Sequence, residues 1–343
     1  MSVVIGWDIG GAHLKAARVA RGRVDATAQV ATPLWLGLES LHSAFDRLKQ
    51  QVGAADAHVL TMTGELCDAF PSRREGVVGL AAIAVQHLAP TSARFYAGAA
   101  GFVGSEDVEL RAVEIASANW RASAELVALR LPEALLIDVG STTVDLIPVV
   151  AGKVASVGAD DAHRLAAGEL VYSGMVRSFV MAMARRAPFR GAWTPLMNEF
   201  FASSADVYRI LGVLPDGADM MSTADGREKT IDASCARLAR MVGREADEAD
   251  VSEWRALARW FAEAQTRDIC DAALLRLSRG DVAADAPVVA AGIGEPVTAE
   301  VARRLGHSWR TFASLIGAPE EASRCAPAAA VAMLAEARLD AHA

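Results

Sequence analysis

The stretch "LLIDVGSTTVDLIPV" (residues 135–149) decides the fold. It begins and ends with strand-forming residues, but an aspartate, a glycine and three hydroxyl residues separate the two runs. A strand that turns directly into another strand at Asp-x-Gly leaves backbone N–H groups pointing outward, where an oxygen anion can bind. Gly140 lacks the β-carbon that would keep a phosphate away, and Ser141, Thr142 and Thr143 add hydroxyl donors. We therefore predict a phosphate-binding turn between two strands.

The same pattern occurs near the N-terminus, in "VIGWDIGGAHLKAARV" (residues 4–19). Moving this stretch forward by 130 positions places Asp8 on Asp138 and Gly10 on Gly140 without a gap. An internal repeat at this distance predicts two similar half-domains that face one another. The phosphate-binding residues expected in the first copy are Gly10, Gly11, His13 and Lys15. The alternative interpretation is that the lysine is solvated and the histidine is only a polar turn residue.

The repeated aspartates predict a metal ion. A carboxylate that faces a phosphate is repelled by it unless a divalent cation lies between them. Magnesium suits Asp8 and Asp138, since it prefers a few carboxylate and water oxygens together with substrate phosphate. Alternatively, each aspartate caps its own turn by accepting backbone N–H groups.

A third glycine turn, "AAGIG" (residues 290–294), stands between an expected strand and an expected helix. Gly292 and Gly294 offer a further phosphate-binding surface at a helix N-terminus. Glycines before a helix are also common packing devices, so this signal gains its weight from the two earlier turns.

Composition limits the class of protein. The chain has 343 residues, enough for two domains, and is 52% hydrophobic and 22% charged, as in a soluble globular protein. A net charge of −8 argues against a nucleic-acid surface, and no apolar run is long enough to span a bilayer. The four cysteines are far apart, which favours reduced thiols over a zinc site. The first residues lack the features of a signal peptide, so we expect a cytoplasmic protein.

Hydrophobic periodicity predicts the domain organisation. Residues 1–133 form the first expected domain, and residues 134–321 form the second. Residues 187–230 look irregular and are expected to be an insertion that covers the cleft, while a C-terminal helix (322–340) packs back on the first domain. Helices are predicted over residues 38–48, 76–88, 111–128, 231–243 and 251–279, and in the tail of residues 160–186.

Two Asp-Gly hairpins and a late glycine turn resemble the acetate and sugar kinase/Hsp70/actin superfamily. The likeness covers essentially the whole chain and implies an α/β fold in which two ribonuclease H-like domains of the actin-like ATPase type surround a central cleft. Within that superfamily the chain is similar to the hydantoinase/oxoprolinase-related proteins of tetrahydromethanopterin-linked C1 transfer. The motifs that carry this resemblance occur in order: "GWDIGGAHLKAA", "TMTGELCDAF", "SANWRASA", "LLIDVGSTTVDLIPV", "GELVYSGMVRS" and "TADGREKT".

The resemblance implies a transferase of methanofuran biosynthesis. Such an enzyme joins an aminomethylfuran-methyl diphosphate to the phenol oxygen of a tyramine- or tyrosine-containing acceptor and releases diphosphate. Both expected partners of the protein are therefore small molecules. The metal and backbone groups that would hold the end of ATP would hold this diphosphate, so Mg²⁺ is the expected cofactor and ATP is not expected to be required.

Further residues are candidates for the organic substrate. A cation-like furan-methyl carbon must be shielded from water, and the candidate aromatic residues are Trp7, Trp120, Tyr172 and Trp193. The acceptor carboxylate or the diphosphate tail can be met by Arg177, Lys229 and Arg237, and Asp225 is a further substrate-binding candidate because it lies in the expected insertion.

A base is needed for the phenol, whose ordinary pKa is about 10. Glu65 and Glu169 are candidates on the side of the organic substrate, and Asp145 is the candidate on the phosphate side. A glutamate just after a glycine is also a common residue at the start of a helix. With the metal ligands included, the expected catalytic residues are Asp8, Asp138, Asp145, Glu65 and Glu169.

Two other functions compete with this interpretation. The parent fold also serves ATP-dependent kinases and hydantoinase/oxoprolinase-like ATPases, so a small-molecule kinase or an amide hydrolase is the first alternative. A nucleotide-sensing partner of C1-transfer enzymes, without activity of its own, is the second.

Overall fold

The computed structural model describes residues 2–158 and 160–340, which divide into two compact units. Unit 1 comprises Met1–Leu136, Ile147–Ser156 and Arg310–Ala343, and unit 2 comprises Ile137–Leu146 and Val157–Trp309. The chain therefore passes between the units at four places, after residues 136, 146, 156 and 309. None of the described helices is long and apolar enough to cross a membrane.

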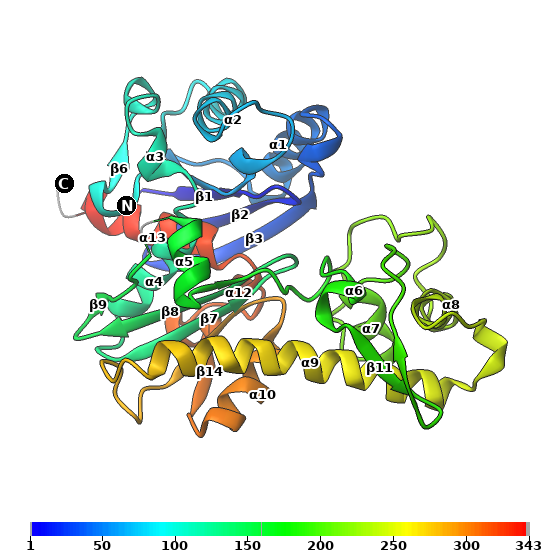
Figure 1. Ribbon diagram of the computed structural model, residues 1–343. Coiled ribbons are helices and arrows are strands. Elements are labelled where there is room, and N and C mark those ends of the chain that lie inside the picture. The colour runs from blue at the N-terminus through cyan, green and yellow to red at the C-terminus, as the bar shows by residue number, and fades with distance from the viewer. Residues whose placement is uncertain (1, 159, 341–343) are drawn as a thin grey trace. The chain divides into compact units, whose positions relative to one another are not determined.

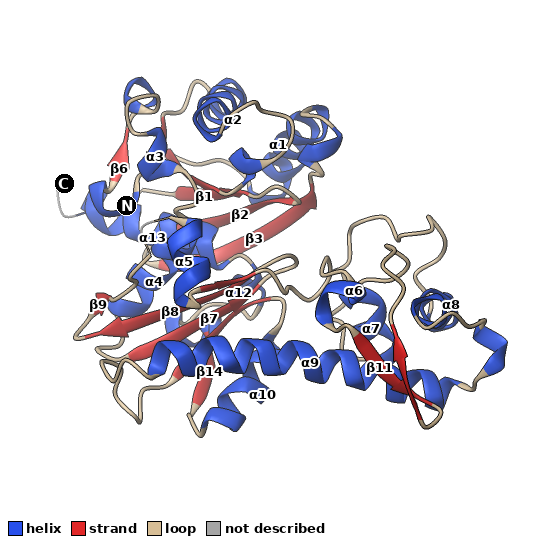
Figure 2. Cartoon of the chain, in the orientation of Figure 1, coloured by secondary structure: helices blue, strands red, loops and turns tan. Residues whose placement is uncertain are grey.

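A six-stranded sheet forms the centre of unit 1, in the order β3-β2-β1-β4-β5-β6 (Figure 2). Its strands are β1 (Val4–Ile9), β2 (His13–Ala20), β3 (Arg23–Ala31), β4 (Ala57–Met62), β5 (Ala93–Tyr96) and β6 (Phe102–Val103). The first three strands pair antiparallel, whereas β4 is parallel to both β1 and β5. This arrangement places the carboxyl ends of β1 and β4 at the same edge of the sheet.

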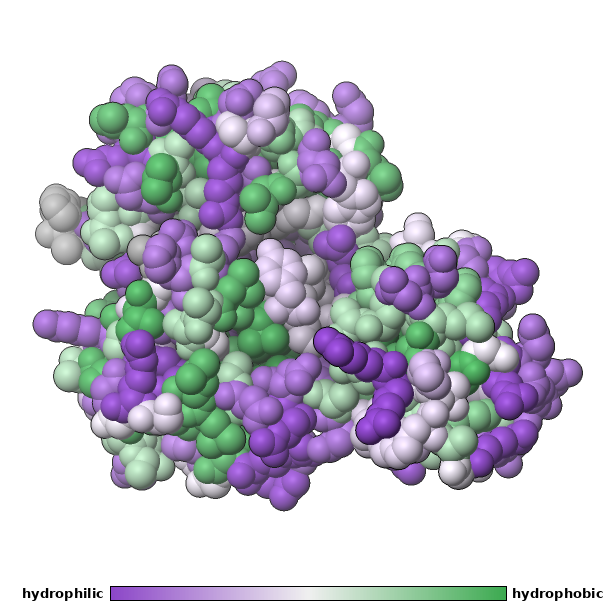
Figure 3. Space-filling view, viewed as in Figure 1, coloured by the Kyte–Doolittle hydropathy of each residue, from purple (hydrophilic) through white to green (hydrophobic). Residues whose placement is uncertain are grey.

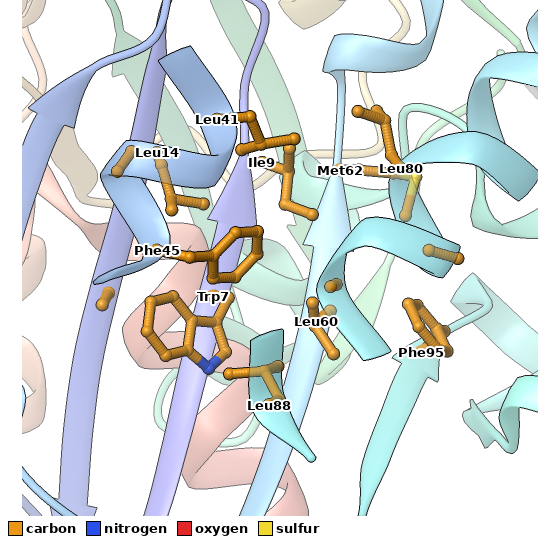
Figure 4. Close-up of a cluster of buried hydrophobic side chains, with 14 of the residues drawn as sticks. Trp7, Ile9, Leu14, Leu41, Phe45, Leu60, Met62, Leu80, Leu88 and Phe95 are labelled. Atoms are coloured by element: carbon orange, nitrogen blue, oxygen red, sulfur yellow. The ribbon is translucent and has the colours of Figure 1, made fainter. Parts of the chain in front are cut away.

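One face of this sheet carries the apolar core of unit 1 (Figure 4). Trp7 is fully buried there against Phe45 of α1, with ring centroids 5.2 Å apart, and its indole N–H donates to His58 Nδ1 at 3.2 Å. The sequence offered Trp7 as a shield for the substrate, but the structure makes it a core residue. The helices that cover this face and its ends are α1 (Glu39–Val52), α2 (Arg73–Leu88), α3 (Ala112–Ile115), η1 (Leu34–Leu36), η2 (Gly64–Leu66), η3 (Gly98–Ala100) and η4 (Ser105–Asp107).

The other face is covered by the C-terminal helix α13 (Ala326–Asp340), which packs on β1, β2 and α4 (Asn119–Ala128) (Figure 1). Residue 6 of β1 must be glycine, because a β-carbon there would lie 2.0 Å from the carbonyl oxygen of Ala328. The short helices α11 (Phe312–Ile316) and α12 (Glu321–Arg324) lead into α13.

The second sheet has the order β10-β8-β7-β13-β14, and β9 pairs with β8. Its strands are β7 (Ala134–Val139), β8 (Val144–Val150), β9 (Lys153–Val154), β10 (Leu170–Val171), β13 (Val288–Gly292) and β14 (Trp309–Thr311). When β9 is left out, five strands occur in the same spatial order in both sheets: β3-β2-β1-β4-β5 in the first corresponds to β10-β8-β7-β13-β14 in the second. The order supports the predicted repeat. α5 (Asp161–Ala167) and α10 (Glu295–Leu305) are helices of unit 2 that adjoin this sheet.

Unit 2 also contains a helical subdomain between β10 and β13, with an apolar core of its own. It consists of α6 (Val180–Met183), β11 (Arg186–Phe189), β12 (Ala192–Pro195), α7 (Ser204–Leu211), α8 (Ile231–Met241), η5 (Ala246–Glu248) and the first part of α9 (Val251–Leu277). α9 packs on α7 and α8 and also on α5 and α10, so it joins the subdomain to the rest of unit 2 (Figure 1). On the face seen in Figure 3, hydrophilic and hydrophobic side chains are interspersed.

The expectation that residues 187–230 are irregular was wrong in part. This stretch contains a hairpin and α7, a helix that begins with a capping box between Ser203 and Asp206 and ends at the left-handed Gly212. The prolines that suggested a loop lie outside α7. They indicate the edges of short elements here.

Two helix predictions were also wrong. The expected helix over 111–128 is divided into α3 and α4, because Ser117 adopts a positive φ of 50°. In the expected helical tail of 160–186 only the four residues of α6 are helical, whereas α5 lies at the start of that stretch and ends at the left-handed Gly168. In both places a local backbone feature overrides the apolar spacing.

We predict that Gly6→Ala lowers the free energy of unfolding by roughly 1–3 kcal/mol, because the added methyl group forces α13 away from β1. Chemical denaturation of the purified variant measures this change. Gly11→Ala is the matched control, since no atom lies within 4 Å of a β-carbon built at that position. Equal stabilities of the two variants would contradict the close packing of α13 on β1.

Candidate functional site

The two glycine turns have the same internal hydrogen bond. In the first turn Gly10 N donates to His13 O at 2.9 Å, and in the second Gly140 N donates to Thr143 O at 2.9 Å. The four residues are related by the same shift that aligns the two sequence stretches. The repeat is therefore present in the backbone geometry as well as in the sequence.

The segments that flank the two turns repeat as well. Thr63 N donates to Ile9 O at 3.0 Å beside the first turn, and Ile293 N donates to Val139 O at 2.9 Å beside the second. On the opposite side, Thr32 N donates to Ala12 O at 2.8 Å, as Gly174 N donates to Thr142 O at 2.9 Å. Each turn is thus held between two segments. One follows β4 or β13, and the other follows β3 or β10.

The second turn brings Asp138 and the glycines of residues 290–294 together. A β-carbon at Gly292 would lie 2.4 Å from Asp138 Oδ1 and 2.2 Å from Val139 O, and its φ of 82° is strained for any other residue. Gly294 N also donates to Val139 O, at 3.0 Å, and α10 begins at the next residue. The carboxylate, the turn and the start of a helix therefore meet within unit 2, an arrangement suited to an anion and its cation.

The loop 173–177 supports the second turn from the other side. A β-carbon at Gly174 would lie 2.4 Å from the backbone of Ser141, so the two segments touch. Arg177 N donates to Ser141 O at 2.8 Å, and Arg177 Nη1 donates to Thr142 Oγ1 at 3.2 Å. Burial lowers the pKa of the Arg177 guanidinium, but an arginine remains charged in a protein. A fixed positive charge therefore lies beside the predicted anion site.

Buried polar side chains fix this loop in place. The carbonyl oxygen of Gly174 accepts from Ser178 Oγ, Ser204 Oγ and Gln265 Nε2, each at 2.9 Å. The Tyr208 hydroxyl donates to Gln265 Oε1, and burial raises the pKa of Tyr208, which keeps that hydroxyl protonated. Helices α7 and α9 thus hold the loop that holds the turn.

The first turn is more enclosed. Asp8 and His13 are 4% and 8% exposed, whereas Gly11 is open on the side where its β-carbon would be. The register of β1 places Lys15 opposite Asp8 on one side and Thr61 opposite it on the other. Residues directly opposite one another share a face of the sheet, so a lysine and an aspartate stand side by side there.

Glu65 belongs to a buried polar cluster next to the first turn. It is 1% exposed; Ser117 Oγ donates to its Oε1 at 2.8 Å, and Arg73 Nε lies 3.6 Å from the same oxygen. Arg73 Nη2 also donates to Ser117 Oγ at 3.0 Å. Ser117 has the positive φ that divides α3 from α4, and such backbone strain clusters at functional sites. Sequence reasoning missed Arg73 and Ser117, although the serine opens the quoted motif "SANWRASA". Trp120 of that motif lies on α4 and is 7% exposed.

Glu169 and Asp145 lie in a separate buried network of unit 2. Both Glu169 oxygens accept backbone N–H groups, from Val157 at 2.9 Å and Gly158 at 3.2 Å, and the residue is fully buried. Asp145 Oδ1 accepts from Arg164 Nη2 at 2.6 Å. Arg276 Nε lies 3.6 Å from Glu169 Oε1. These contacts fix the start of unit 2 after residue 156.

The remaining polar candidates stabilise the helical subdomain. Asp225 accepts from Arg227 N and Arg237 Nη1, both at 3.1 Å, and Lys229 Nζ donates to Asp219 O at 2.8 Å. Arg237 is fully buried. The structure therefore ties the motif "TADGREKT" to α8. The hydrogen bonds described here for these charged groups are made within the subdomain.

Two candidate aromatic residues lie at the surface of unit 2. Tyr172, directly before the loop that holds the second turn, is 55% exposed. Trp193 on β12 is 52% exposed, packs edge-on against Trp260, and lies under the guanidinium of Arg186 at 4.5 Å. Of the two, Tyr172 is the one whose neighbours in the chain contact the turn.

Acidic, histidine and cysteine side chains do not gather into a ready metal cage: across residues 2–158 and 160–340, no group of three or more could hold an ion. Asp8 and Asp138 each stand at the end of their own strand beside a glycine turn.

Comparison with known proteins identifies relatives. The hydantoinase/oxoprolinase family model matches residues 56–338. Over 241 residues the chain is 30% identical to a synthase of Methanocaldococcus jannaschii, which covers 70% of this chain and 71% of that protein. The named product of that synthase is a furan-2-yl methanamine that carries a 4-(2-(gamma-L-glutamylamino)ethyl)phenoxymethyl group. The synthase of the same name from Methanococcus vannielii is 32% identical over 108 residues, or 32% of this chain and 48% of that protein.

Among solved structures, a nucleotide-free acetone carboxylase covers 96% of this chain and 70% of its own, with a TM-score of 0.56 and 12% identity. That likeness concerns the fold. Together with the repeated strand order, it confirms the predicted α/β fold of the actin-like ATPase type, with two ribonuclease H-like sheets. By the family match and the 30% identity, the chain belongs to the hydantoinase/oxoprolinase family.

Proposed function

We propose that the protein is a transferase of methanofuran-type cofactor biosynthesis. It joins the methyl carbon of an aminomethylfuran-methyl diphosphate to the phenol oxygen of a tyramine- or tyrosine-containing acceptor. The observation that carries the proposal is the second turn, where the backbone amides and hydroxyls of residues 141–143, Asp138 and Arg177 are held by the same contacts and form a set of groups suited to diphosphate. The product named for the archaeal relatives contains the phenoxymethyl-furan ether that this reaction makes.

The reaction is a balanced substitution. The bond between the furan-methyl carbon and the diphosphate oxygen breaks, the ether bond to the phenol oxygen forms, and the phenol proton leaves. Negative charge develops on the departing diphosphate, where donors fixed in advance are most effective. The amides and hydroxyls of residues 141–143 and the Arg177 guanidinium are such donors, because the loop 173–177 holds them in place, whereas the Gly140 amide closes the turn on Thr143 O.

Magnesium fits the donor set of the second turn. Asp138 supplies a carboxylate oxygen at the strand end, next to the Ser141 and Thr142 hydroxyls, and this ion takes few protein ligands together with phosphate oxygens and water. Asp8 is the corresponding ligand proposed for unit 1. When bound, the ion supplies positive charge that offsets the charge of the diphosphate.

Of the two glutamates, we assign Glu65 to the acceptor side. Both oxygens of Glu169 accept backbone amides, so that carboxylate already serves as an anchor for residues 157 and 158. Glu65 is held by side chains instead. One of them is Ser117 of the motif "SANWRASA", whose backbone is strained. A carboxylate oriented by Ser117 and Arg73 is suited to accept the phenol proton.

The first prediction of this proposal is the reaction itself. Purified protein, aminomethylfuran-methyl diphosphate, magnesium and either tyrosine, tyramine or glutamyl-tyramine should give the ether and one diphosphate for each ether, and ATP should not change the rate. Mass spectrometry and a diphosphate assay measure the two products. Formation of ADP in place of the ether, and only when ATP is present, would instead establish the kinase or hydrolase alternative.

A second prediction concerns the metal. Asp138→Asn should raise the magnesium concentration needed for half-maximal activity by on the order of tenfold or more, because the amide lacks the charge that attracts the ion. Activity measured across a magnesium titration gives this value. Asp107→Asn, at an exposed aspartate of η4, is the control and should match the unaltered protein. An unchanged magnesium requirement in Asp138→Asn would remove Asp138 from the metal site.

A third prediction separates the two glutamates. Glu65→Gln should lower kcat about 100-fold or more while leaving the Kd for the diphosphate substrate unchanged. Glu169→Gln should lower the free energy of unfolding by roughly 1–3 kcal/mol, because the buried amides of Val157 and Gly158 lose their charged acceptor, while Arg276 keeps its pair with Asp281. Single-turnover kinetics and chemical denaturation measure the two effects. The assignment fails if Glu65→Gln retains full kcat.

A further inference from the structure

Two phenylalanine rings are exposed in unit 2 and contact each other. Phe179 and Phe200 are each 43% exposed, and their ring centroids lie 4.3 Å apart at an interplanar angle of 43°. Both rings stand outside the apolar core of the helical subdomain. A single exposed apolar side chain needs no explanation. Two exposed aromatic rings that contact each other, one of them on the segment that directly follows Arg177 in the chain, require an explanation.

The backbone fixes this aromatic pair to the second turn. Phe179 forms a β-bridge with Ser203, and Val180 N donates to Ala202 O at 3.1 Å. Phe200 therefore precedes a segment that is paired with the segment of Phe179. The same two segments supply Ser178 and Ser204, whose hydroxyls both donate to Gly174 O.

Gly174 connects the pair to the anion site. Its amide donates to Thr142 O at 2.9 Å, while its carbonyl accepts from the two serines. The rings and the turn are thus held by opposite ends of one residue. A surface fixed in this way is preorganised for a ligand that contacts both parts.

The anion site and the rings are also close along the chain. Phe179 follows Arg177 by two residues, a separation of at most about 7 Å. Ser178 between them is 8% exposed and turned inward, whereas its neighbours are the more exposed side chains. Both residues lie on a segment that is fixed to its neighbours: Arg177 N donates to Ser141 O at 2.8 Å, and Val180 N, directly after Phe179, donates to Ala202 O at 3.1 Å.

Resting on the function proposed above, we propose that Phe179 and Phe200 bind the furan ring of the diphosphate substrate, while residues 141–143 and Arg177 bind its diphosphate. The substrate has the two matching parts, a planar ring and a polyanion joined through one methyl carbon. Aromatic faces pack on such a ring. They also attract positive charge, which develops on the furan-methyl carbon as diphosphate leaves.

The test compares two ligands by isothermal titration calorimetry, with magnesium present and no acceptor. The probes are aminomethylfuran-methyl diphosphate and inorganic diphosphate. The unaltered protein should bind the furan compound roughly tenfold more tightly. In Phe179→Leu and Phe200→Leu this preference should disappear, with the Kd for inorganic diphosphate unchanged. Trp309→Leu, at another exposed aromatic residue of unit 2, is the matched control and should keep the preference.

Each other outcome is decisive. If the leucine variants keep the preference, or raise only the KM of the phenolic acceptor, the rings do not bind the furan. If they weaken both ligands equally, their role is structural and the proposal is overturned. If the unaltered protein makes the ether but binds both ligands equally, the proposed function stands and the aromatic site is rejected. If it binds neither ligand and makes no ether, the proposed function itself fails.

Discussion

The carbonyl group at the end of β7 holds the second anion turn together. Val139 O accepts two amides, from Ile293 at 2.9 Å and Gly294 at 3.0 Å, so the last peptide of β7 is bound to the residues that start α10. Such close contact is possible only if residue 292 is glycine, both for its positive φ and for the space beside Val139 O. The positions of the Asp138 carboxylate, the turn amides and the α10 N-terminus all depend on this contact. The first turn is built in the same way around Ile9 O, which suggests that both copies keep one backbone solution for one kind of ligand.

The buried acids of the chain fall into two groups with different physical roles. Burying a charge pair yields little net stability compared with apolar packing, but leaving one partner alone is costly. Glu169 satisfies both oxygens with backbone amides, so its charge determines the path of residues 157 and 158. Glu65 contacts the side chain of Ser117, whose backbone is strained. Backbone strain of this kind is found preferentially at functional sites. The partner atoms therefore distinguish an anchoring acid from an acid available for chemistry.

The sequence predicted the parts of the fold that depend on local chemistry. Asp8, Asp138 and the glycines of the turns were recognisable because a strand that ends in Asp-x-Gly has few alternatives, and the repeat doubled the signal. The break at Ser117 was not recognisable, since nothing in its neighbours requires a positive φ. The cluster of Glu65, Arg73 and Ser117 joins residues 52 positions apart, which no local pattern can indicate.

Phe179 and Phe200 were missed for a related reason. An aromatic residue in a stretch of mixed character is equally compatible with a core and with a surface. Only the structure shows that the two rings meet, with centroids 4.3 Å apart, and that both remain exposed. By contrast, Trp7 and Trp120 stood in recognised motifs, yet the sequence could not tell that their rings are buried.

The anion turn alone does not select a substrate, because the amides of residues 141–143 would bind the end of ATP and an organic diphosphate equally well. Selection must come from the groups fixed next to it. In unit 2 those groups are a guanidinium held on Thr142 and a pair of aromatic rings tied to the same loop. A nucleotide would also present a ring to such a surface, but its ring is separated from the terminal phosphates by a sugar and further phosphates. A furan-methyl diphosphate carries its ring one carbon from the diphosphate, which matches a separation of two residues between Arg177 and Phe179. The short spacing of charge and ring along one anchored segment is therefore the feature that favours a small aryl-methyl diphosphate over a nucleotide.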